Sequence, residues 1–420
     1  MLASDVVTQK KEFDKLSIDI TRSLSKEEKK NDGIYFTPPG TIYKHLEYLK
    51  PYFSSIKTVL EPSCGSCEFI KAIRALYPEG VSITGIEKNK NVFDAIRHIT
   101  DVDLRNEDFL SFSEESKYDL IIGNPPYFVM KKKDVDKKYY PYFEGRPNIF
   151  ILFIIKSLSL LNQNGILSFV LPKNFLNCLY YSKTRKYIYE EFTILDIMEC
   201  SDKYIDTQQE TIVVIIQKGV NGGKCNDAYT LNGGDGGDGV NYGDDYYIFG
   251  MKDDIVELRK LYMGSTTLNK LDYSVSVGSV VWNQHKSILT DDTSKTRLIY
   301  SSDIGDGVLN LKTYKNDEKK NFIAMDGVTD PMLVINRGYG MGSYKFDHCL
   351  IEGGFEYLIE NHLICIKYNK GGNREEIVEA FRSIIESLND ERTKQFIKLY
   401  FGNNAINTTE MNNVLPIYLL

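Results

Sequence analysis

Short apolar runs alternate with amphipathic stretches throughout the first half of the chain. After the first run, Phe69, Ile70, Ile73 and Leu76 recur at the spacing of one helix face. Strands that alternate with helices are typical of a mostly parallel sheet with helices on both faces, so the pattern predicts an α/β fold. The runs that we expect to be strands lie at 58–61, 81–86, 102–104, 118–122, 165–172 and 211–217.

The periodic pattern stops between residues 219 and 245, where glycine, aspartate and asparagine dominate. A segment of this composition buries little apolar area, and we expect a flexible acidic linker over 223–246. It separates a first domain, 1–222, from a second domain, 247–420. The second domain mixes short β-rich runs with a helical stretch, which indicates an α+β fold. These segments lie at 275–284, 298–300, 332–340 and 375–387.

Polar or small residues follow the predicted strands of the first domain. The carboxyl ends of parallel strands meet at one edge of a sheet, where open α/β sheets bind ligands. Glu87, about twenty residues beyond the small-residue turn at 62–67, is placed to accept both hydroxyls of a ribose. Asp108 and Phe109 form a carboxylate beside an aromatic ring, a pair that suits the amino group and the face of an adenine. The sequence therefore predicts a nucleotide-type site at this edge.

The tetrapeptide Asn124-Pro125-Pro126-Tyr127 follows the strand at 118–122. The amide oxygen of Asn124 and a neighbouring backbone carbonyl are acceptors for both N–H groups of an amine. The two prolines stiffen the turn and donate no N–H, and Tyr127 offers a face on which a planar base stacks. These features suit methyl transfer to a nitrogen whose lone pair is delocalised into a π-system.

In this order and spacing the motifs resemble the γ class of S-adenosylmethionine-dependent DNA adenine-N6 methyltransferases, of the Taq type. The opening motif of that class matches residues 33–39, and its cofactor loop matches 60–69, except that Cys67 replaces the usual second glycine. A cysteine demands an ordinary φ, which sets this position apart from the family pattern. Later family segments match at 147–150, 165–172 and 211–217.

The resemblance implies a Rossmann-like methyltransferase domain followed by an α+β target-recognition domain. It implies S-adenosylmethionine as the cofactor and double-stranded DNA as the substrate, with an adenine rotated out between two aromatic rings. The residues that it assigns to catalysis are Asn124, Pro125, Tyr127 and, ahead of the last strand, Tyr204, with Tyr180 and Tyr181 as competitors of Tyr204. The residues that it assigns to the cofactor are Tyr35, Thr37, Glu61, Ser63, Cys64, Gly65, Glu87, Asp108, Phe109 and Asn124.

The formal net charge of −7 argues mildly against a nucleic-acid partner, because phosphate binding relies on lysine and arginine. The local distribution of charge weakens this argument, because lysines interleaved with tyrosines are concentrated in the segment after the Asn-Pro-Pro-Tyr turn. A loop at this position could bind a phosphate backbone. A solvated charged loop is the alternative interpretation. In the second domain, polar side chains on loops suit contacts with base edges. The residues that we expect to contact DNA are Lys131, Lys132, Lys133, Lys137, Lys138, Asn283, Gln284, Lys286 and Arg337.

The seven cysteines include the pair Cys64 and Cys67, but no second pair accompanies them and both lie in the cofactor turn. We therefore expect no metal site. No apolar run approaches the roughly twenty residues that span a bilayer. We expect a monomer without a secretory signal, located in the cytoplasm or, for a viral source, in the DNA-containing compartment of the host. Any cognate restriction endonuclease is expected to be a separate chain.

Four other functions stay open at this point. N4-cytosine DNA methylation uses the same amine chemistry, and RNA adenine-N6 methylation uses the same base. Protein-glutamine methylation also uses Asn-Pro-Pro-Tyr, but that family carries a small helical domain before the cofactor fold and nothing large after it. A non-catalytic DNA-binding relative would be expected to have lost Asn124, Tyr127 or the acids of the cofactor site, and all of these are present.

Overall fold

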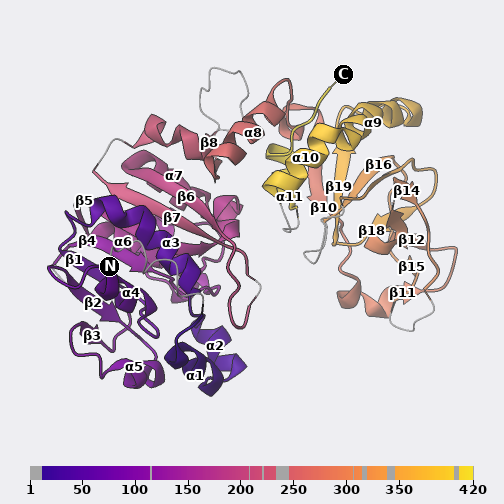
Figure 1. Cartoon of the computed structure of the whole chain (residues 1–420). Coiled ribbons are helices and arrows are strands. Elements are labelled where there is room, and N and C mark those ends of the chain that lie inside the picture. Colours follow the sequence, from indigo (N-terminus) through magenta and orange to yellow (C-terminus); the bar gives the residue numbers. More distant parts are fainter. Residues whose placement is uncertain are drawn as a thin grey trace. The chain divides into compact units, whose positions relative to one another are not determined.

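The computed structural model describes residues 12–113, 116–207, 209–219, 222–232, 246–305, 307–314, 319–337, 346–401 and 406–419. The chain divides into two compact units (Figure 1). The first comprises residues 1–231 and 246–255, and the second comprises residues 232–245 and 256–420. Among the described residues, no helix has the length and apolar character needed to cross a membrane.

The first unit is built on a seven-stranded sheet in the order β3-β2-β1-β4-β5-β7-β6. Strands β1 to β5 run parallel, and β7 pairs antiparallel with both β5 and β6. This mixed, mostly parallel arrangement confirms the predicted Rossmann-like fold. All six predicted strands are present, and β6 is additional to them. The bounds are Thr58–Glu61 (β1), Ser82–Ile86 (β2), Asp103–Arg105 (β3), Tyr118–Gly123 (β4), Leu161–Pro172 (β5), Phe192–Cys200 (β6) and Thr211–Lys218 (β7).

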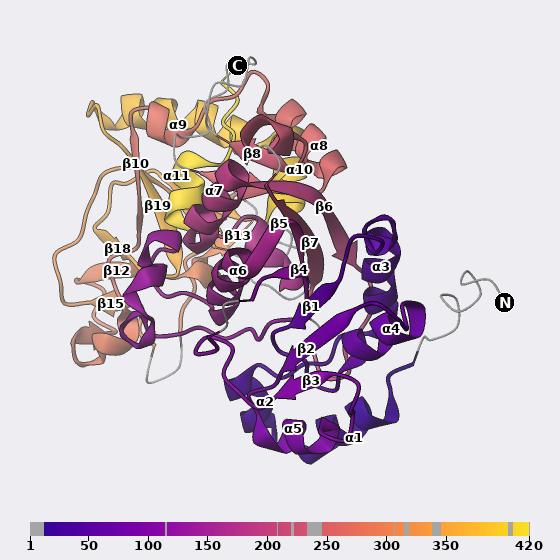
Figure 2. The ribbon, with the colours of Figure 1, turned by 90° about the vertical axis from the view of Figure 1, so that its left-hand side faces the viewer.

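Helices on both faces of this sheet give the unit two apolar cores (Figure 2). Along β4, Leu120 and Ile122 face the core that α3 and α4 complete, while Ile121 faces the core that α6 and α7 complete. Successive side chains of a strand point to opposite faces, so a continuous apolar run serves both cores. The bounds are Pro39–Leu49 (α3), Glu68–Leu76 (α4), Lys90–Ile96 (α5), Ile149–Leu160 (α6) and Ser182–Glu191 (α7).

Two short helices, α1 (Lys15–Ser23) and α2 (Lys26–Asp32), precede the sheet. Apolar side chains of α1 and its C-terminal end pack with Phe36 and Val92 in a small separate core. Gly33 ends α2 with a left-handed φ of 66°. A Cβ atom at this glycine would lie 2.8 Å from the Cβ atom of Pro126, so the close approach of the two motifs requires glycine.

The first unit extends beyond the boundary that the composition predicts. Residues 223–232 form a 3-10 helix and the strand β8 (Thr230–Asn232), which pairs with β9 (Tyr247–Phe249). Tyr229 and Phe249 are buried in a core of this unit, so the segments that carry them belong to it. The expected linker over 223–246 therefore begins too early, and its central part, 233–245, lies outside the described residues.

The second unit combines two four-stranded sheets with helices, in agreement with the α+β prediction. The sheet β10-β19-β16-β17 is antiparallel, whereas β12 and β18 pair in parallel in the sheet β11-β15-β12-β18. The strand bounds are Tyr273–Val277 (β10), Leu289–Thr290 (β11), Thr296–Ile299 (β12), Phe322–Ile323 (β15), Met332–Asn336 (β16), His348–Ile351 (β17), Tyr357–Ile359 (β18) and Leu363–Tyr368 (β19). The principal helices are Lys252–Tyr262 (α8), which begins in the first unit, Arg374–Asn389 (α9), Glu391–Tyr400 (α10) and Thr408–Asn413 (α11).

The predicted segments of this unit are present with altered bounds. The run at 275–284 divides into β10 and a 3-10 helix at Trp282–Gln284, because Gly278 interrupts the strand. The run at 298–300 lies at the end of β12, and the helical stretch at 375–387 lies within α9. The run at 332–340 is a strand as far as Asn336, and its last residues lie outside the described part of the chain.

Candidate active site

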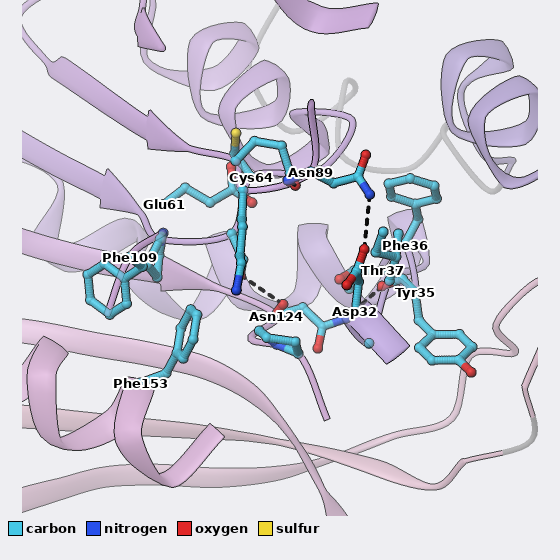
Figure 3. A pocket seen from close by; sticks show the side chains of 18 of the residues that line it. Asp32, Tyr35, Phe36, Thr37, Glu61, Cys64, Asn89, Phe109, Asn124 and Phe153 are labelled. Atoms are coloured by element: carbon cyan, nitrogen blue, oxygen red, sulfur yellow. Dashed lines mark hydrogen bonds between the residues drawn. The ribbon is translucent and has the colours of Figure 1, made fainter. Parts of the chain in front are cut away.

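A pocket opens beside the carboxyl ends of β1, β2 and β4 (Figure 3). Its lining comes from the segment after α2, the turn after β1, the ends of β2 and β4, the residues after β3, and α6. The structure brings together every residue that the sequence assigns to the cofactor. These are Tyr35, Thr37, Glu61, Ser63, Cys64, Gly65, Glu87, Asp108, Phe109 and Asn124.

The turn after β1 places backbone N–H groups and small side chains at the pocket. Gly65 and Cys67 both adopt left-handed backbone conformations, with φ of 49° and 62°. The expected ordinary φ at Cys67 is therefore wrong. A left-handed non-glycine residue costs about 1–2 kcal/mol. The Cys67 side chain is fully buried in the core that α3 and α4 complete, and this packing offsets the strain.

Glu87 is a buried carboxylate that follows β2. It accepts hydrogen bonds from the backbone N–H groups of Gly65 at 2.9 Å and Asn89 at 2.7 Å. Burial raises the pKa of Glu87 to about 7, and the two backbone hydrogen bonds oppose that rise. The Asn89 amide also donates to the Asp32 carboxylate at 3.0 Å. Asp32 and Asn89 both line the pocket, and sequence reasoning missed them.

Glu61 is 3% exposed, and its Oε2 atom has no hydrogen-bond partner among the described residues. Burial raises the pKa of Glu61 well above its usual range, and the neighbouring Cys67, Glu87 and Glu68 act in the same direction. An unpartnered buried carboxylate oxygen is costly unless a donor or a cation reaches it. The residue lines the pocket, so a ligand there with an amino group would meet this need.

The pocket lining is strongly acidic. Lys88 is the single basic residue in the described lining, against the acids Asp32, Glu61, Glu68, Glu87 and Asp108. This balance favours a cationic ligand. S-adenosylmethionine carries a sulfonium and an ammonium group, and its ribose and adenine match the remaining acceptors and apolar surface.

An apolar slot occupies one end of the pocket. Phe109 and Phe153 line it with ring centroids 4.9 Å apart, and Phe128 and Ile149 also contribute. The Asp108 carboxylate accepts from the Leu110 backbone N–H at 2.9 Å and pairs with Lys88 at 2.9 Å. Sequence reasoning missed Phe153 because α6 is apolar on nearly all sides and no single residue stands out.

Asn124 stands at the boundary of the pocket, where β4 ends. Its Nδ2 atom donates to the Tyr35 carbonyl at 3.0 Å, and its own carbonyl accepts from the Ser63 hydroxyl at 3.1 Å. The Tyr127 hydroxyl donates to Asn124 Oδ1 at 2.5 Å and to the Val170 carbonyl at 2.8 Å. The Asn124 amide is thus oriented from both sides. Its Oδ1 atom keeps one lone pair for a further donor.

Tyr204 is 8% exposed, and its hydroxyl donates to the Thr211 hydroxyl at 3.4 Å. Burial raises the pKa of Tyr127 well above its usual range, and Tyr204 adds to the rise. Tyr181 is buried in a core against Phe150, whereas Tyr180 is exposed.

The five lysines after the Asn-Pro-Pro-Tyr turn are all exposed. Lys132 lies 4.9 Å from the centroid of the Tyr140 ring, and Lys138 lies 5.1 Å from that of Tyr139, so this segment is ordered by cation–π contacts. Lys138 also pairs with Asp136 at 3.4 Å, which reduces the charge of the loop.

In the second unit, Asn283, Gln284 and Lys286 are exposed and adjacent, with Lys286 5.6 Å from the centroid of the Trp282 ring. Arg337 is half-buried just after β16. The described residues contain no cluster of histidine, cysteine and acidic side chains that would hold a metal ion.

The chain is similar in sequence to several known proteins. Residues 66–205 match the family described as Eco57I restriction-modification methylase. The chain is 26% identical to the type II methyltransferase M.CvrRI of Paramecium bursaria Chlorella virus XZ-6E, over 97% of this chain and 99% of that protein. It is also 26% identical, with the same coverage, to the modification methylase CviBIII of Paramecium bursaria Chlorella virus NC1A. Over 32% of the chain and 33% of the relative, it is 30% identical to the type II methyltransferase M.TthHB8I of Thermus thermophilus.

These similarities span both units of the chain, because the two viral relatives are matched over nearly their whole length. The family match begins at Ser66, near the end of the turn after β1, and contains the Asn-Pro-Pro-Tyr turn and Tyr204. The fold, the acidic nucleotide-type pocket and these sequence similarities together identify S-adenosylmethionine as the cofactor.

Proposed function

We propose that the protein, a DNA methyltransferase of the type II restriction-modification kind, methylates the exocyclic N6 of an adenine within a short duplex recognition sequence. The observation that carries this proposal is the position of Asn124. Its side chain lines the cofactor pocket, and its Oδ1 atom is oriented by the bonds to Tyr35 and Tyr127. An acceptor fixed at the edge of the pocket is what an incoming amine needs.

We assign the parts of S-adenosylmethionine to the pocket by their chemistry. Glu61, with its unpartnered Oε2, would hold the ammonium group. Glu87 would accept the ribose hydroxyls, and Phe109 and Phe153, which contact each other, would supply an apolar surface against which the adenine packs. When bound, the cofactor supplies an electrophilic methyl group on a sulfonium, so the protein needs no nucleophile of its own.

Asn124 and Pro125 act on the target amine. Asn124 Oδ1 accepts one N–H of the amine, and the Pro125 carbonyl accepts the other. Holding both protons draws the nitrogen toward tetrahedral geometry and directs its lone pair toward the methyl donor. The same acceptors disperse the positive charge that develops on the nitrogen, and one such contact contributes on the order of 3 kcal/mol to the transition state. The displaced proton passes to solvent after transfer.

Tyr127 and Tyr204 receive the extruded base. Rotating a base out of a duplex costs a few kcal/mol, which stacking between aromatic rings offsets. The pairing rests on the position of Tyr204 ahead of the last strand, as in the family pattern. Tyr181 and Tyr204 are buried to a similar degree, at 6% and 8% exposed, so Tyr180 and Tyr181 both stay alternatives to Tyr204.

We assign phosphate contacts to the lysine loop and base contacts to the second unit. The exposed Lys131, Lys132, Lys133, Lys137 and Lys138 follow the Asn-Pro-Pro-Tyr turn directly, so they are the cations next to the acceptor site in sequence. The assigned base readers are the exposed Asn283, Gln284 and Lys286 and the half-buried Arg337. We further propose that the protein acts as a monomer and that any cognate endonuclease is a separate chain.

N4-methylation of cytosine is the second candidate, because Asn124 would accept from that amine in the same way. The decisive experiment incubates plasmid DNA with the protein and methyl-labelled S-adenosylmethionine, digests the DNA to nucleosides and separates them by mass spectrometry. Label in N6-methyldeoxyadenosine supports the proposal. Label in N4-methyldeoxycytidine would contradict the assigned base, and label in RNA alone, tested in parallel, would contradict the substrate.

A further inference from the structure

Lys156, on α6, lies behind the wall of the cofactor pocket. Its Nζ atom donates hydrogen bonds to the carbonyls of Phe109 at 2.5 Å, Leu110 at 3.0 Å and Phe112 at 2.5 Å. It also lies 5.0 Å from the centroid of the Phe109 ring and 5.9 Å from that of Phe112. An ammonium group has three N–H donors, and these three carbonyls use all of them.

The three carbonyls belong to one tight turn. The backbone N–H groups of Ser111 and Phe112 both bond to the Asp108 carbonyl at 2.9 Å, and the Asp108 carboxylate accepts from Leu110. With the N–H groups directed inward in this way, the carbonyls of 109, 110 and 112 converge on Lys156. The Phe109 carbonyl also accepts from the Phe112 backbone N–H at 3.2 Å, and the lysine supplies a charged donor to all three carbonyls beside an apolar core.

We propose that Lys156 is a positioning residue for the cofactor, which fixes the turn at 108–112 so that Phe109 and Asp108 meet the adenosine part of S-adenosylmethionine. The inference rests on the proposed cofactor pocket and is independent of which base is methylated. Lys156 itself is absent from the pocket lining, whereas Asp108 and Phe109 are both part of it.

The charge of Lys156 is maintained under ordinary conditions. Burial lowers its pKa to about 8, with Lys138 adding to the decrease and Asp108 opposing it. The group is therefore still mainly an ammonium at neutral pH, with all three donors in place. Arg105 lies on the same Phe112 ring, 5.3 Å from its centroid, and Lys88 pairs with the Asp108 carboxylate of this turn at 2.9 Å.

Two substitutions distinguish the effect of the hydrogen-bond donors of Lys156 from the effect of its side-chain volume. Lys156→Met keeps the length of the side chain and removes every donor, whereas Lys156→Arg keeps donors on a longer side chain. Lys117→Met is the matched control, because Lys117 also donates to a carbonyl of α6, that of Ser159 at 2.8 Å, but has no part in the pocket.

The ligand for the test is 5′-methylthioadenosine, which carries the adenosine part of the cofactor without its amino acid, and binding is measured by calorimetry without DNA. Losing hydrogen bonds from a charged donor corresponds to a loss of affinity of about tenfold or more. We expect that loss in Lys156→Met, partial recovery in Lys156→Arg and no change in Lys117→Met. The KM for S-adenosylmethionine should rise by a larger factor than kcat falls.

Wild-type affinity for 5′-methylthioadenosine in folded Lys156→Met would overturn the proposal, as would equal losses in Lys156→Met and Lys117→Met. If circular dichroism shows that Lys156→Met does not fold, Lys156→Gln takes its place, since its amide retains two donors. Unchanged affinity in folded Lys156→Gln, which can donate to at most two of the three carbonyls, together with a wild-type KM would equally reject the role. Because no DNA is present, a failure of cofactor positioning is distinct from a failure of the proposed target base.

Discussion

The hydroxyl of Tyr127 donates a 2.5 Å hydrogen bond to the Oδ1 atom of Asn124 and lies 2.8 Å from the carbonyl of Val170. One proton serves both acceptors, so the bond joins the end of β4 to the end of β5. It also fixes which end of the Asn124 amide faces the acceptor site, because Nδ2 is held by the Tyr35 carbonyl. The aromatic residue of the motif therefore orients the amide in addition to offering a stacking face.

We expect Asn124→Ala to abolish methyl transfer while S-adenosylmethionine affinity changes only a few-fold. Loss of one acceptor at the developing charge costs on the order of 3 kcal/mol or more, which is at least about a hundredfold in kcat. Single-turnover transfer to DNA and calorimetric binding of the cofactor measure the two quantities. Full activity in this variant would contradict the assignment of Asn124 as the acceptor for the target amine.

The bond between the two residues makes Tyr127→Phe informative. Phenylalanine keeps the stacking face and removes the hydroxyl, so we expect kcat to fall by about tenfold or less, the usual value of a neutral hydrogen bond. Tyr127→Ala, which removes the ring as well, should be more severe. A Tyr127→Phe variant as slow as Asn124→Ala would mean that the hydroxyl itself takes part in transfer, contrary to a role that is limited to orienting the amide and stacking on the base.

Glu87 predicts a pH dependence of cofactor binding. Its pKa is raised to about 7, so the carboxylate that we propose accepts the ribose hydroxyls is present above that pH and becomes protonated below it. Affinity for 5′-methylthioadenosine should therefore fall as the pH is lowered from about 8 to about 6, and Glu87→Gln should remove this dependence. At the higher pH the substitution should weaken binding by about 1–3 kcal/mol. A wild-type curve that is flat over this range would assign the ribose contact to another residue.

Tyr204→Ala should be milder than Asn124→Ala, because Tyr127 can still stack on one face of the extruded base. A mismatch or abasic site opposite the target adenine should rescue it in part, because extrusion then costs less. Fluorescence of 2-aminopurine at the target position reports extrusion directly, with Tyr180→Ala as the comparison. Unchanged fluorescence and turnover in Tyr204→Ala, with a defect in Tyr180→Ala, would transfer the role to the exposed Tyr180.

Strands β1, β2 and β4, whose ends line the pocket, were predictable because each is a largely buried apolar run followed by, or ending at, a polar residue. Strand β6 was not, since Asp196 and Glu199 interrupt its apolar pattern and it lies at the edge of the sheet. The same contrast holds within the pocket. Glu61 and Glu87 occupy motif positions, whereas Phe153 becomes a lining residue only through the tertiary placement of α6.

The backbone conformation of Cys67 and the hydrogen bonds of Lys156 could not be predicted from the sequence either. A left-handed φ at Cys67 became acceptable through burial of its side chain, which no local preference indicates. Lys156 has no motif around it, and its three acceptors converge only once the turn after β3 has formed. Near the glycine-rich segment, the linker was predicted from average composition, which gives little weight to a few apolar side chains. Tyr229 and Phe249 are two such side chains, and they complete the core of the first unit.

Those apolar side chains predict where the chain can be divided. A fragment ending at residue 222 lacks Tyr229, Leu231 and Phe249, all at most 3% exposed, whereas a fragment ending at 255 keeps them. Removing several large core side chains costs more than about 5 kcal/mol, so the shorter fragment should be far less stable in urea or on heating. Equal stability of the two fragments would place the boundary where the composition alone puts it.

The fragment 1–255 also tests the division of labour between the two units. It contains the whole pocket lining, so it should bind S-adenosylmethionine with an affinity close to that of the full chain. Without the second unit it should lose sequence-specific DNA affinity by at least about 4 kcal/mol, the lower end of the usual gap between specific and non-specific binding. Fluorescence anisotropy with duplexes that contain or lack the methylated sequence, identified by mapping the modified plasmid, measures this loss at one fixed salt concentration. Retained discrimination in 1–255 would place target recognition in the first unit and remove the assigned role of Asn283, Gln284, Lys286 and Arg337.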